Sequence, residues 1–405
     1  IVDALECADV LLFNGCMVRQ KAEEKLLGRL GAVVEEKRRR SVILGVGGCF
    51  GQIHGAAILA RSTAVDFVFG TRGQASLPAL IERVVRGAER PTGVDASDGG
   101  EGFAPVRRSS VSAMITITEG CSNFCSYCIV PYARGPMRSR PPEGILAEVR
   151  SVVEEGYREV LLLGQNVNSY GRDRSSYGGF ADLLRRVART GVDRVRFTSS
   201  HPRDLTDAII EAMATEPRVC RHLHLACQSG NDRVLGAMRR GYSRERYLEL
   251  IGAARKAMAD LNVTTDIIVG YPGESEEEFR DTLSLVEQAR FGSVYAAKYS
   301  PRPLTRAAAS VDDVSPAEKE ERLERLLQVQ RRIALEENGR FVGRDVTVLI
   351  EGRTRNGASY GRAEDHRTVV VHGAAEVGEL LPVHVEGAAA AALVGVSFVS
   401  EGAVS

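Results

Sequence analysis

The chain has 405 residues, of which 44% are hydrophobic and 26% charged, and its 53 basic side chains equal its 53 acidic ones. This is the composition of a globular protein of two or three domains, and the zero net charge excludes nucleic-acid binding through a global positive field. No apolar run is long enough to cross a bilayer and the start lacks secretory-signal features, so we expect a cytoplasmic protein with no membrane partner.

The first ninety residues predict a small α/β domain. Three apolar runs read as buried strands, each followed by a helical pattern: "ADVLLFNGC", "SVILGVGGC" and "AVDFVFGT". The firmest helical pattern covers residues 21–39, where Leu26, Leu30 and Val33 recur at three- and four-residue spacing. Residues 91–106 mix Gly, Pro, Asp and Ser without periodicity, so we expect a linker after a domain of residues 1–90.

Residues 107–338 predict a second, larger domain. Amphipathic helical stretches separate six strand-like segments, "SAMITIT", "REVLLLG", "RVRFTSS", "RHLHLAC", "VTTDIIVG" and "SVYAAKYS". This alternation implies a parallel sheet, and right-handed crossovers would curl it into an open (βα)6 partial barrel. Unusual polar sequence follows the strands, so the active face is expected at their C-terminal ends.

The C-terminal part of the chain predicts a third domain. A charged helix at about 315–339 is followed by apolar and polar residues that alternate between Gly-containing turns. This pattern is typical of a small β-barrel, which we assign to residues 339–405.

Three cysteines follow the first strand of the predicted partial barrel, in "GCSNFCSYC". Thiolates as close as Cys121, Cys125 and Cys128 can hold one corner of an iron-sulfur cube, and three ligands on a 4Fe-4S cluster leave one iron open to bind a substrate. The alternative is a zinc site completed by a distant His or Cys. Against zinc, the three-residue gap is unlike a C-x-x-C arm, and no second pair follows downstream.

This cysteine spacing after the first strand of an open βα barrel resembles the radical S-adenosylmethionine superfamily. The resemblance implies that the open iron binds the amino and carboxylate groups of S-adenosylmethionine, and that an electron from the cluster splits the cofactor to a 5′-deoxyadenosyl radical. The motifs "LLGQNVNSYG", "RFTSSHPRDL", "HLHLACQSGNDRVLGAMRRGY" and "TTDIIVGYPGE" are in addition similar to the MiaB type of tRNA methylthiotransferase, over nearly the whole chain.

The N-terminal domain resembles the same family. "FNGCMVRQ" and "GVGGCFGQ" match its auxiliary-cluster motifs, which implies that Cys16 and Cys49 bind a second 4Fe-4S cluster that carries or donates the sulfur. The third ligand of that family is expected upstream of Ile1, and Cys7 is expected to be a plain thiol. Without the resemblance, Cys16 and Cys49 would be read as core thiols.

Five further residues are candidates for cofactor binding because of where they fall in these motifs. They are Tyr127, Gln165, Ser199, Gln228 and Gly270. The polar side chains at strand ends could equally cap the following helices, Gly270 could only shape a turn, and Tyr127 could only pack its loop. His222 and His224 alternate on a strand and are expected to be structural.

Several arginines are candidates for binding RNA: Arg134, Arg138 and Arg140 after the cysteines, and Arg353 and Arg355 in the C-terminal barrel. Guanidinium groups suit tRNA phosphates or the cofactor carboxylate, and the alternative is a solvated face. The C-terminal barrel resembles a TRAM domain, an RNA-binding module of the oligonucleotide-binding kind.

Three hypotheses for the function follow. The first is methylthiolation at carbon 2 of N6-dimethylallyladenosine beside the tRNA anticodon, which would use two 4Fe-4S clusters, S-adenosylmethionine, a reducing electron donor protein and a sulfur source. The second is a sister methylthiotransferase acting on threonylcarbamoyladenosine in tRNA or on a ribosomal protein aspartate. The third is a non-catalytic iron-sulfur protein that binds RNA or transfers electrons, but such a protein has no use for an open iron.

Overall fold

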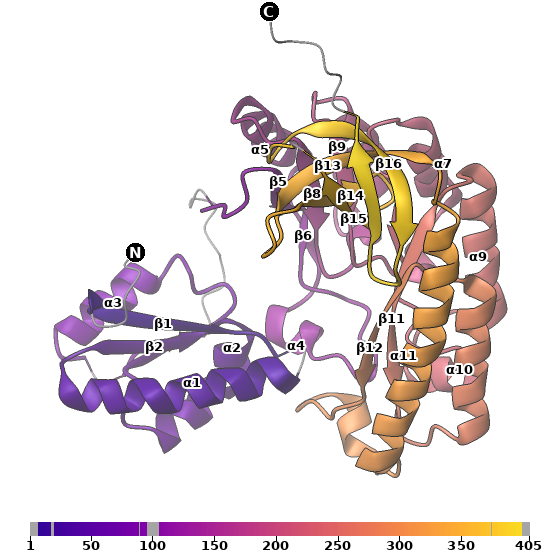
Figure 1. The fold of residues 1–405 in the computed structure, drawn as a ribbon. Helices are drawn as coiled ribbons and strands as arrows, with labels where there is room; N and C mark the ends of the chain where they lie inside the picture. The colour runs from indigo at the N-terminus through magenta and orange to yellow at the C-terminus, as the bar shows by residue number, and fades with distance from the viewer. Residues whose placement is uncertain (1–6, 18–19, 89, 95–104, 374, 399–405) are drawn as a thin grey trace, which may run out of the picture. The chain divides into compact units, whose positions relative to one another are not determined.

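The computed structural model describes residues 7–17, 20–88, 90–94, 105–373 and 375–398 (Figure 1). It contains two compact units, which we describe separately. The first unit comprises Ile1–Val106, Gly120–Pro136 and Arg302–Thr305, and the second comprises the remainder of the chain. These units follow spatial proximity, so the sequence-based domain boundaries at residues 90, 106 and 338 stay predictions. None of the described helices combines the length and apolar character needed to cross a membrane.

A parallel sheet of four strands forms the centre of the first unit. Its strands follow the order β1 (Val10–Gly15), β2 (Ile43–Gly47), β3 (Phe67–Phe69) and β4 (Thr92–Gly93). The first three strands lie in the segments predicted from sequence. The fourth lies in the predicted linker and was missed, because two residues are too short for a periodic pattern.

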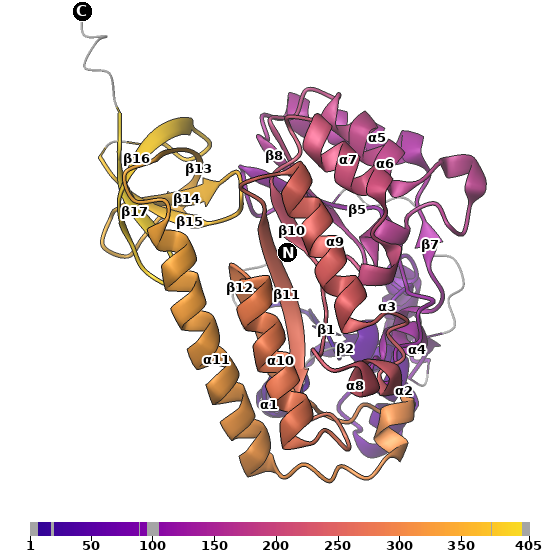
Figure 2. The same cartoon turned by 90° about the vertical axis from the view of Figure 1, so that its right-hand side faces the viewer.

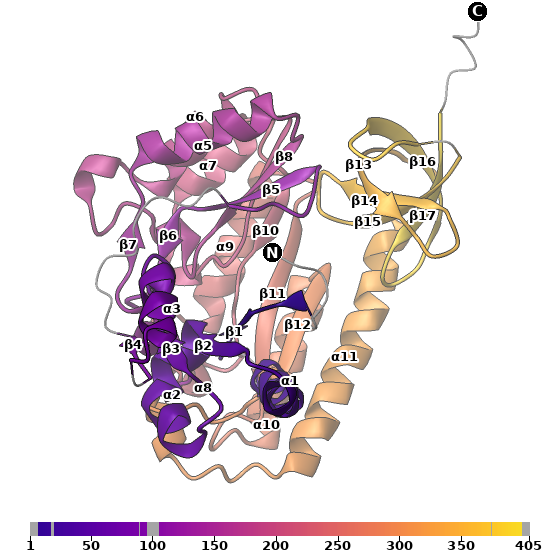
Figure 3. The same ribbon diagram turned by 90° about the vertical axis from the view of Figure 1, so that its left-hand side faces the viewer.

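Helices cover both faces of this sheet (Figure 3). Helix α1 (Gln20–Arg39) and helix α2 (Gly48–Arg61) share one apolar core with Leu44 and Val46 of β2. Helix α3 (Leu77–Val85) packs through Leu80 on Phe67 and Phe69, which face the opposite side of the sheet. Alternating strand residues therefore supply two separate cores.

Six parallel strands form the centre of the second unit, as predicted. They are β5 (Ser112–Thr116), β8 (Glu159–Leu163), β9 (Arg194–Phe197), β10 (His222–His224), β11 (Asn262–Val269) and β12 (Ser293–Lys298). Each sheet of three is regular, and single bridges such as Ser200 to Leu225 join β9 to β10. Together they make an open partial barrel in sequence order.

Helices lie on the outside of these strands (Figure 2). They are α5 (Pro142–Glu154), α6 (Phe180–Ala188), α7 (Asp207–Thr215), α9 (Arg244–Ala257) and α10 (Glu276–Ala289). Helix α10 begins at a capping box in which Ser275 and Glu278 satisfy each other's backbone N–H groups. The helices bury an apolar face against strand residues such as Val160, Leu162 and Val263.

The C-terminal segment is a closed five-stranded barrel, as predicted. Helix α11 (Pro316–Gly339) leads to it, and its strands are β13 (Asp345–Arg353), β14 (Ser359–Ala363), β15 (Thr368–His372), β16 (Leu380–Ala388) and β17 (Leu393–Ser397). Hydrogen bonds close it in the order β13-β14-β15-β17-β16. Its interior is aliphatic, with Val348, Ile350 and Val383 fully buried.

Two arginines of β9 attach this small barrel to the partial barrel. Arg194 donates to the carbonyl oxygens of Thr347 (2.8 Å) and Arg362 (2.6 Å). Arg196 donates to the carbonyl of Ala363 at 2.8 Å and pairs with Glu159 at 2.6 Å. Because these donors are buried and satisfied by backbone oxygens of the other domain, the small barrel is held in one orientation within this unit.

Candidate active site

Cys16 and Cys49 lie side by side at one edge of the N-terminal sheet. Strands β1 and β2 are parallel, and a bridge pairs Gly15 with Gly48, so each cysteine directly follows one of two paired residues. Neighbouring strands lie about 4.8 Å apart, so the two backbones are close together at the points where the cysteines follow. The pairing requires glycine at position 48, since its φ is +72° and a Cβ atom would lie 2.0 Å from Asn14 Oδ1.

Cys7 lies at the other end of the same strand. It precedes β1 and Cys16 follows it, so eight residues separate them, including all six of the strand. A strand of that length spans about 20 Å, which is far beyond the width of one cluster. The geometry supports the prediction that Cys7 is a plain thiol.

The second cysteine group lies on a tight loop in the same compact unit. The backbone N–H of Cys128 donates to the carbonyl of Cys125 at 3.0 Å, and that of Cys121 donates to Gly135 at 3.1 Å. Cys121 and Cys125 are buried, and Cys128 is half-buried. Phe124, directly before Cys125, has φ +49°, a left-handed conformation that non-glycine residues adopt at some energetic cost.

Two residues beyond β3 tie this loop to the N-terminal sheet. The loop ends in the short helix α4 (Val130–Arg134), whose last carbonyl groups lack helical partners. Thr71 Oγ1 donates to the carbonyl of Ala133 at 2.9 Å, and Arg72 Nη2 donates to that of Arg134 at 3.0 Å. Since β3 neighbours β2, the helix that follows Cys128 is bound at the edge where Cys16 and Cys49 lie.

These residues fit iron-sulfur clusters in donor chemistry. Thiolates from one loop and from two paired strand ends are the soft ligands that iron-sulfur clusters use. Cys49 also lies in the first turn of α2, where unsatisfied N–H groups favour a negatively charged ligand. Within the part of the chain that the structure describes, no three His, Cys, Asp or Glu side chains are close enough together to hold a metal ion. The ligand assignment therefore stays a prediction.

Buried polar atoms gather at the C-terminal ends of the first barrel strands. The following side-chain atoms have no hydrogen-bond partner among the described residues: Thr118 Oγ1, Gln165 Oε1, Asn166 Oδ1, Ser200 Oγ and His201 Nε2. An unpaired buried polar atom costs about 1 to 3 kcal/mol, so five of them after β5, β8 and β9 point to a polar ligand. Gln165 is one of the residues that the sequence predicted to bind the cofactor, and the other four follow the same or neighbouring strands.

His201 presents an N–H donor at these strand ends. Its Nδ1 accepts the backbone N–H of Arg203 at 3.2 Å, so the proton of the neutral ring is on Nε2. Burial, followed by the positive charges of Arg240, Arg203 and Arg172, lowers the pKa of His201 to about 2. The ring is therefore neutral at physiological pH, and it can donate to an anionic or carbonyl oxygen.

Ser199 and Gln228, two predicted cofactor-binding residues, share an unusual backbone conformation. Their φ angles are +63° and +76°, in the left-handed region that non-glycine residues occupy at functional sites more than elsewhere. The backbone of Gln228 bonds to β11 through Asp266 and Ile268. Neither side chain forms a helix cap in the described structure, which weakens the capping alternative.

Gly270 closes a turn. Its N–H donates to Glu274 Oε2 at 2.7 Å, and Arg322 Nη1 donates to the same oxygen at 3.0 Å. Its φ is +69°, and a Cβ atom would lie 2.3 Å from Lys319 Cγ. The structure thus gives Gly270 a conformational role, and its contact with the cofactor stays a prediction.

The predicted RNA-binding arginines differ in how available they are. Arg140 Nη1 donates to the carbonyl of Thr116 and to Glu148, so this side chain is engaged within the fold. Arg138, Arg353 and Arg355 are exposed, and Arg134 is half-buried. The exposed ones remain candidates for contacts with phosphate.

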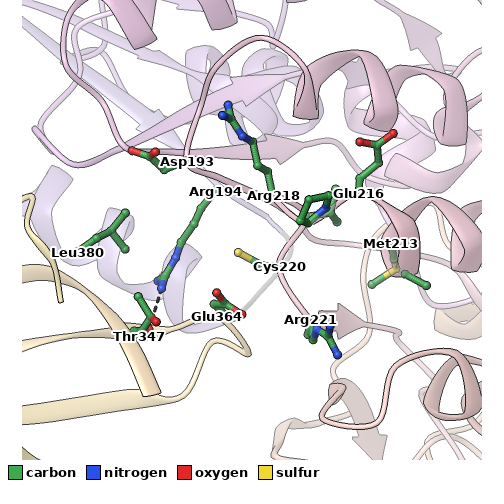
Figure 4. Close-up of a pocket in the computed structure, with 13 residues that line it drawn as sticks. Asp193, Arg194, Met213, Glu216, Arg218, Cys220, Arg221, Thr347, Glu364 and Leu380 are labelled. Atoms are coloured by element: carbon green, nitrogen blue, oxygen red, sulfur yellow. Dashed lines mark hydrogen bonds between the residues drawn. The ribbon is translucent and has the colours of Figure 1, made fainter. Parts of the chain in front are cut away.

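A cavity of about 360 Å³ lies between the partial barrel and the small barrel (Figure 4). Its lining has three basic side chains and three acidic ones, so its charges balance: Arg194, Arg218, Arg221, Asp193, Glu216 and Glu364. Arg194 begins β9, so the cavity is at the N-terminal end of the strands, opposite the end with the unpaired polar atoms. It is therefore not the cofactor site.

Three family profiles match the chain. The Radical SAM superfamily matches residues 115–286, the TRAM domain matches residues 339–396, and the Uncharacterized protein family UPF0004 matches residues 1–70. The Radical SAM match includes the three-cysteine loop and four of the six barrel strands in full, β8 to β11, and the TRAM match covers the closed barrel except its last residue.

Curated relatives are similar over nearly the full length. A protein of Geotalea uraniireducens is 47% identical over 89% of this chain and 84% of its own length. A protein of Pelotomaculum thermopropionicum is 43% identical over 96% of this chain and 90% of its own length. Both are named tRNA-2-methylthio-N6-dimethylallyladenosine synthase. The chain belongs to this family. A further relative, from Frankia casuarinae, has the same name and is 48% identical over 89% of this chain and 69% of its own length.

Solved structures support the fold of this synthase family member at lower identity. TsrM from Kitasatospora setae, a radical S-adenosylmethionine methyltransferase with cobalamin and a 4Fe-4S cluster bound, has a TM-score of 0.58 and 17% identity over 74% of this chain and 66% of that chain. OxsB, a cobalamin-dependent S-adenosylmethionine radical enzyme, has a TM-score of 0.50 and 12% identity over 80% of this chain and 48% of that chain. At these identities the likeness concerns the fold alone.

Proposed function

We propose that the protein is a radical S-adenosylmethionine methylthiotransferase that converts N6-dimethylallyladenosine in tRNA to its 2-methylthio derivative. Full-length similarity to several synthases of that name carries the proposal. The edge of the N-terminal sheet supports it, because one compact unit holds both cysteine groups. Methylthio transfer needs a radical source and a sulfur carrier at one reaction site.

Two 4Fe-4S clusters are assigned to these cysteines. Cys121, Cys125 and Cys128 would hold the cluster that binds S-adenosylmethionine, and Cys16 and Cys49 would contribute ligands to the auxiliary cluster. When bound, the first cluster would supply the electron for reductive cleavage of S-adenosylmethionine, which is the chemistry needed to remove hydrogen from the acceptor carbon. A reducing electron donor protein and a sulfur source are required partners.

The chain's own residues orient the cofactor and exclude water. Gln165, Ser199 and Gln228 would hydrogen-bond its polar groups, and Tyr127 would contact its adenine. His201 Nε2–H would donate to an oxygen of the cofactor, since the bond that Nδ1 accepts fixes the ring proton on Nε2. Burial of Cys121 and Cys125 limits the access of water to the sulfur ligands.

The RNA contacts belong to the C-terminal barrel and its exposed arginines. Arg353 and Arg355 would bind phosphates, which positions the tRNA without reading its sequence. The buried contacts of Arg194 and Arg196 hold the small barrel on the partial barrel, so the RNA anchor keeps one orientation relative to the strands.

Mass spectrometry of nucleosides tests this proposal. Reconstituted protein, S-adenosylmethionine and a reductant are incubated anaerobically with tRNA that carries N6-dimethylallyladenosine and with tRNA that does not. We expect the 2-methylthio product only from the prenylated tRNA. A 2-methylthio derivative of threonylcarbamoyladenosine would assign the protein to the sister activity, and cofactor that stays intact under reduction would contradict radical chemistry.

A further inference from the structure

The inner face of β11 carries a row of polar groups that the site described above does not use. Val263 and Ile267 belong to the core beneath the helices. Since successive strand residues point to opposite faces, Thr264, Asp266 and Ile268 face the inside of the partial barrel. Inner-face residues of a barrel can contact a ligand that enters at the strand ends.

Hydrogen bonds link this row into a chain. His222 Nε2 lies 2.9 Å from Thr264 Oγ1, and His224 Nδ1 lies 3.0 Å from the same oxygen. His224 Nε2 in turn lies 3.1 Å from Asp266 Oδ2. The imidazoles of two histidines and one hydroxyl thus connect strand β10 with the carboxylate of Asp266.

The protons of this chain have one consistent direction. His222 Nδ1 is buried without a partner among the described residues, so the proton of that ring belongs on Nε2 and is donated to Thr264. The Thr264 hydroxyl then donates to His224 Nδ1, which places the proton of His224 on Nε2, facing Asp266. Every donor in this series of hydrogen bonds points toward Asp266, so the bonds fix the orientation of its carboxylate.

Asp266 keeps one oxygen for a further donor. His224 bonds Oδ2, whereas Oδ1 has no hydrogen bond to any residue that the structure describes. The side chain is 35% exposed. A carboxylate held rigidly with one open oxygen is a specific acceptor for an N–H group.

An aromatic ring and a pair of apolar residues lie next to this carboxylate. Tyr295 of β12 pairs in register with Asp266 and is 43% exposed, and its ring centroid lies 5.6 Å from that of His224. The next inward-facing pair toward the strand ends is Ile268 with Ala297, both half-buried. The inner face of β11 and β12, which we call the wall, therefore presents a hydrogen-bond acceptor, then a stacking surface, then an apolar contact toward the strand ends.

The wall is connected to the proposed cofactor site. The Gln228 N–H donates to the carbonyl of Asp266 at 2.8 Å, and the Ile268 N–H donates to that of Gln228 at 3.0 Å. A residue assigned to the cofactor thus lies on the backbone ladder beside Asp266. A base that contacts Asp266 is held next to that position.

We propose that Asp266 and Tyr295 recognise the acceptor adenine: Asp266 Oδ1 accepts the one N–H that remains on a mono-alkylated N6, Tyr295 stacks on the base, and Ile268 contacts the apolar substituent. This assignment rests on the proposed function and adds the residues that would select the N6-alkylated adenine. Base stacking on aromatic side chains and hydrogen bonds to base edges are the usual means of reading an exposed RNA base. A negatively charged N6 substituent is disfavoured here, because its carboxylate would approach that of Asp266.

The test compares anticodon stem-loop RNAs that differ in a single N–H. Fluorescence anisotropy measures binding to the full chain of one RNA with N6-dimethylallyladenosine and of a second with an added methyl group on N6. The second RNA lacks the N–H donor. We expect wild-type protein to prefer the first by about 10- to 100-fold, the range for a hydrogen bond to a charged group. Asp266→Ala should bind both RNAs with equal affinity.

Matched variants separate recognition from loss of fold. Asp266→Asn keeps an acceptor oxygen and should retain part of the preference, Tyr295→Phe should bind as the wild type does, and Tyr295→Ala should weaken both RNAs equally. Glu249→Ala, an exposed carboxylate on α9, is the control and should change nothing. If a folded Asp266→Ala protein kept the full preference for the RNA with the N–H group, the assignment would be overturned. The proposed function would still stand if the nucleoside assay gave the normal 2-methylthio product.

Discussion

Gly15 and Gly48 pair across neighbouring parallel strands, and a cysteine directly follows each of them. Two residues that are thirty-three positions apart in sequence are thereby brought to the same sheet edge. The pairing supports the proposal that these two cysteines bind one cluster, and it predicts which thiol does not take part. Cys7, at the far end of β1, provides the matched control.

Replacing Cys49 by Ala should lower the iron bound after anaerobic reconstitution by up to about four atoms per chain, because a cluster ligand is lost. Cys7→Ala should leave the iron content at the wild-type value. Iron and acid-labile sulfide assays with ultraviolet-visible spectra measure the difference. Equal losses in both variants would place Cys7 among the ligands.

The three-cysteine loop should control cleavage of S-adenosylmethionine. Replacing Cys121, Cys125 and Cys128 together by Ala should abolish 5′-deoxyadenosine formation under reduction, since no other ligand set would present an open iron to the cofactor. Chromatography of the reaction mixture measures this product. Cys227→Ala, a change at a buried thiol beside β11, is the comparison variant and should still cleave the cofactor if it folds. Cleavage at the wild-type rate in the triple variant would rule out the assignment.

Arg196→Met should destabilise the second unit by about 3 to 5 kcal/mol. The change leaves the buried carboxylate of Glu159 unpaired and removes the donor to the carbonyl of Ala363. Urea denaturation measures the loss of unfolding free energy. Arg158→Ala breaks a largely exposed pair with Asp193 and should cost less than about 1 kcal/mol. If the two variants lost similar amounts of unfolding free energy, burial would not be the reason why the Arg196–Glu159 pair matters for stability.

His366 should make the stability depend on pH. Burial, followed by the charges of Arg196 and Arg362, lowers its pKa to about 3, below the value of about 6.5 expected in the unfolded chain. The unfolded chain therefore binds the proton first, and stability is lost as the pH falls below about 6.5.

Between pH 7.5 and 5.5 this histidine should account for up to about 1.4 kcal/mol of that loss. His366→Asn should show a correspondingly smaller pH effect, and Asn tolerates the left-handed backbone found at φ +73°. Urea midpoints at the two pH values measure the effect. An unchanged pH dependence in His366→Asn would show that other groups cause it.

The exposed arginines of the C-terminal barrel should contribute to tRNA affinity through phosphate contacts. Arg353→Ala combined with Arg355→Ala should weaken tRNA binding and reduce the slope of log Kd against log salt by about 1 to 2. With fewer phosphate contacts, fewer counterions are released when the tRNA binds. Titrations at several salt concentrations measure the slope. Arg246→Ala, on α9, should leave the slope unchanged, and an unaltered slope in the double variant would argue against this RNA surface.

Sequence alone determined the fold class and the local chemistry of this protein. Strand-like segments separated by amphipathic helical stretches identified the six barrel strands, and the period of 3.6 in residues 21–39 identified α1, because these patterns depend only on neighbours along the chain. Cys121, Cys125 and Cys128 were recognisable for the same reason, as their spacing lies within one loop. The short strand β4 carried too few residues to produce such a signal.

Tertiary structure decided which distant residues meet. Only the parallel register of β1 with β2 puts Cys16 beside Cys49, and only the packing of α4 brings Thr71 and Arg72 to the end of the cysteine loop. The alternation in "VTTDIIVG" could have shown that Thr264 and Asp266 share a face, but their partners come from β10 and β12. Contacts between separate strands depend on which strands pair and in which register, which local sequence patterns do not encode.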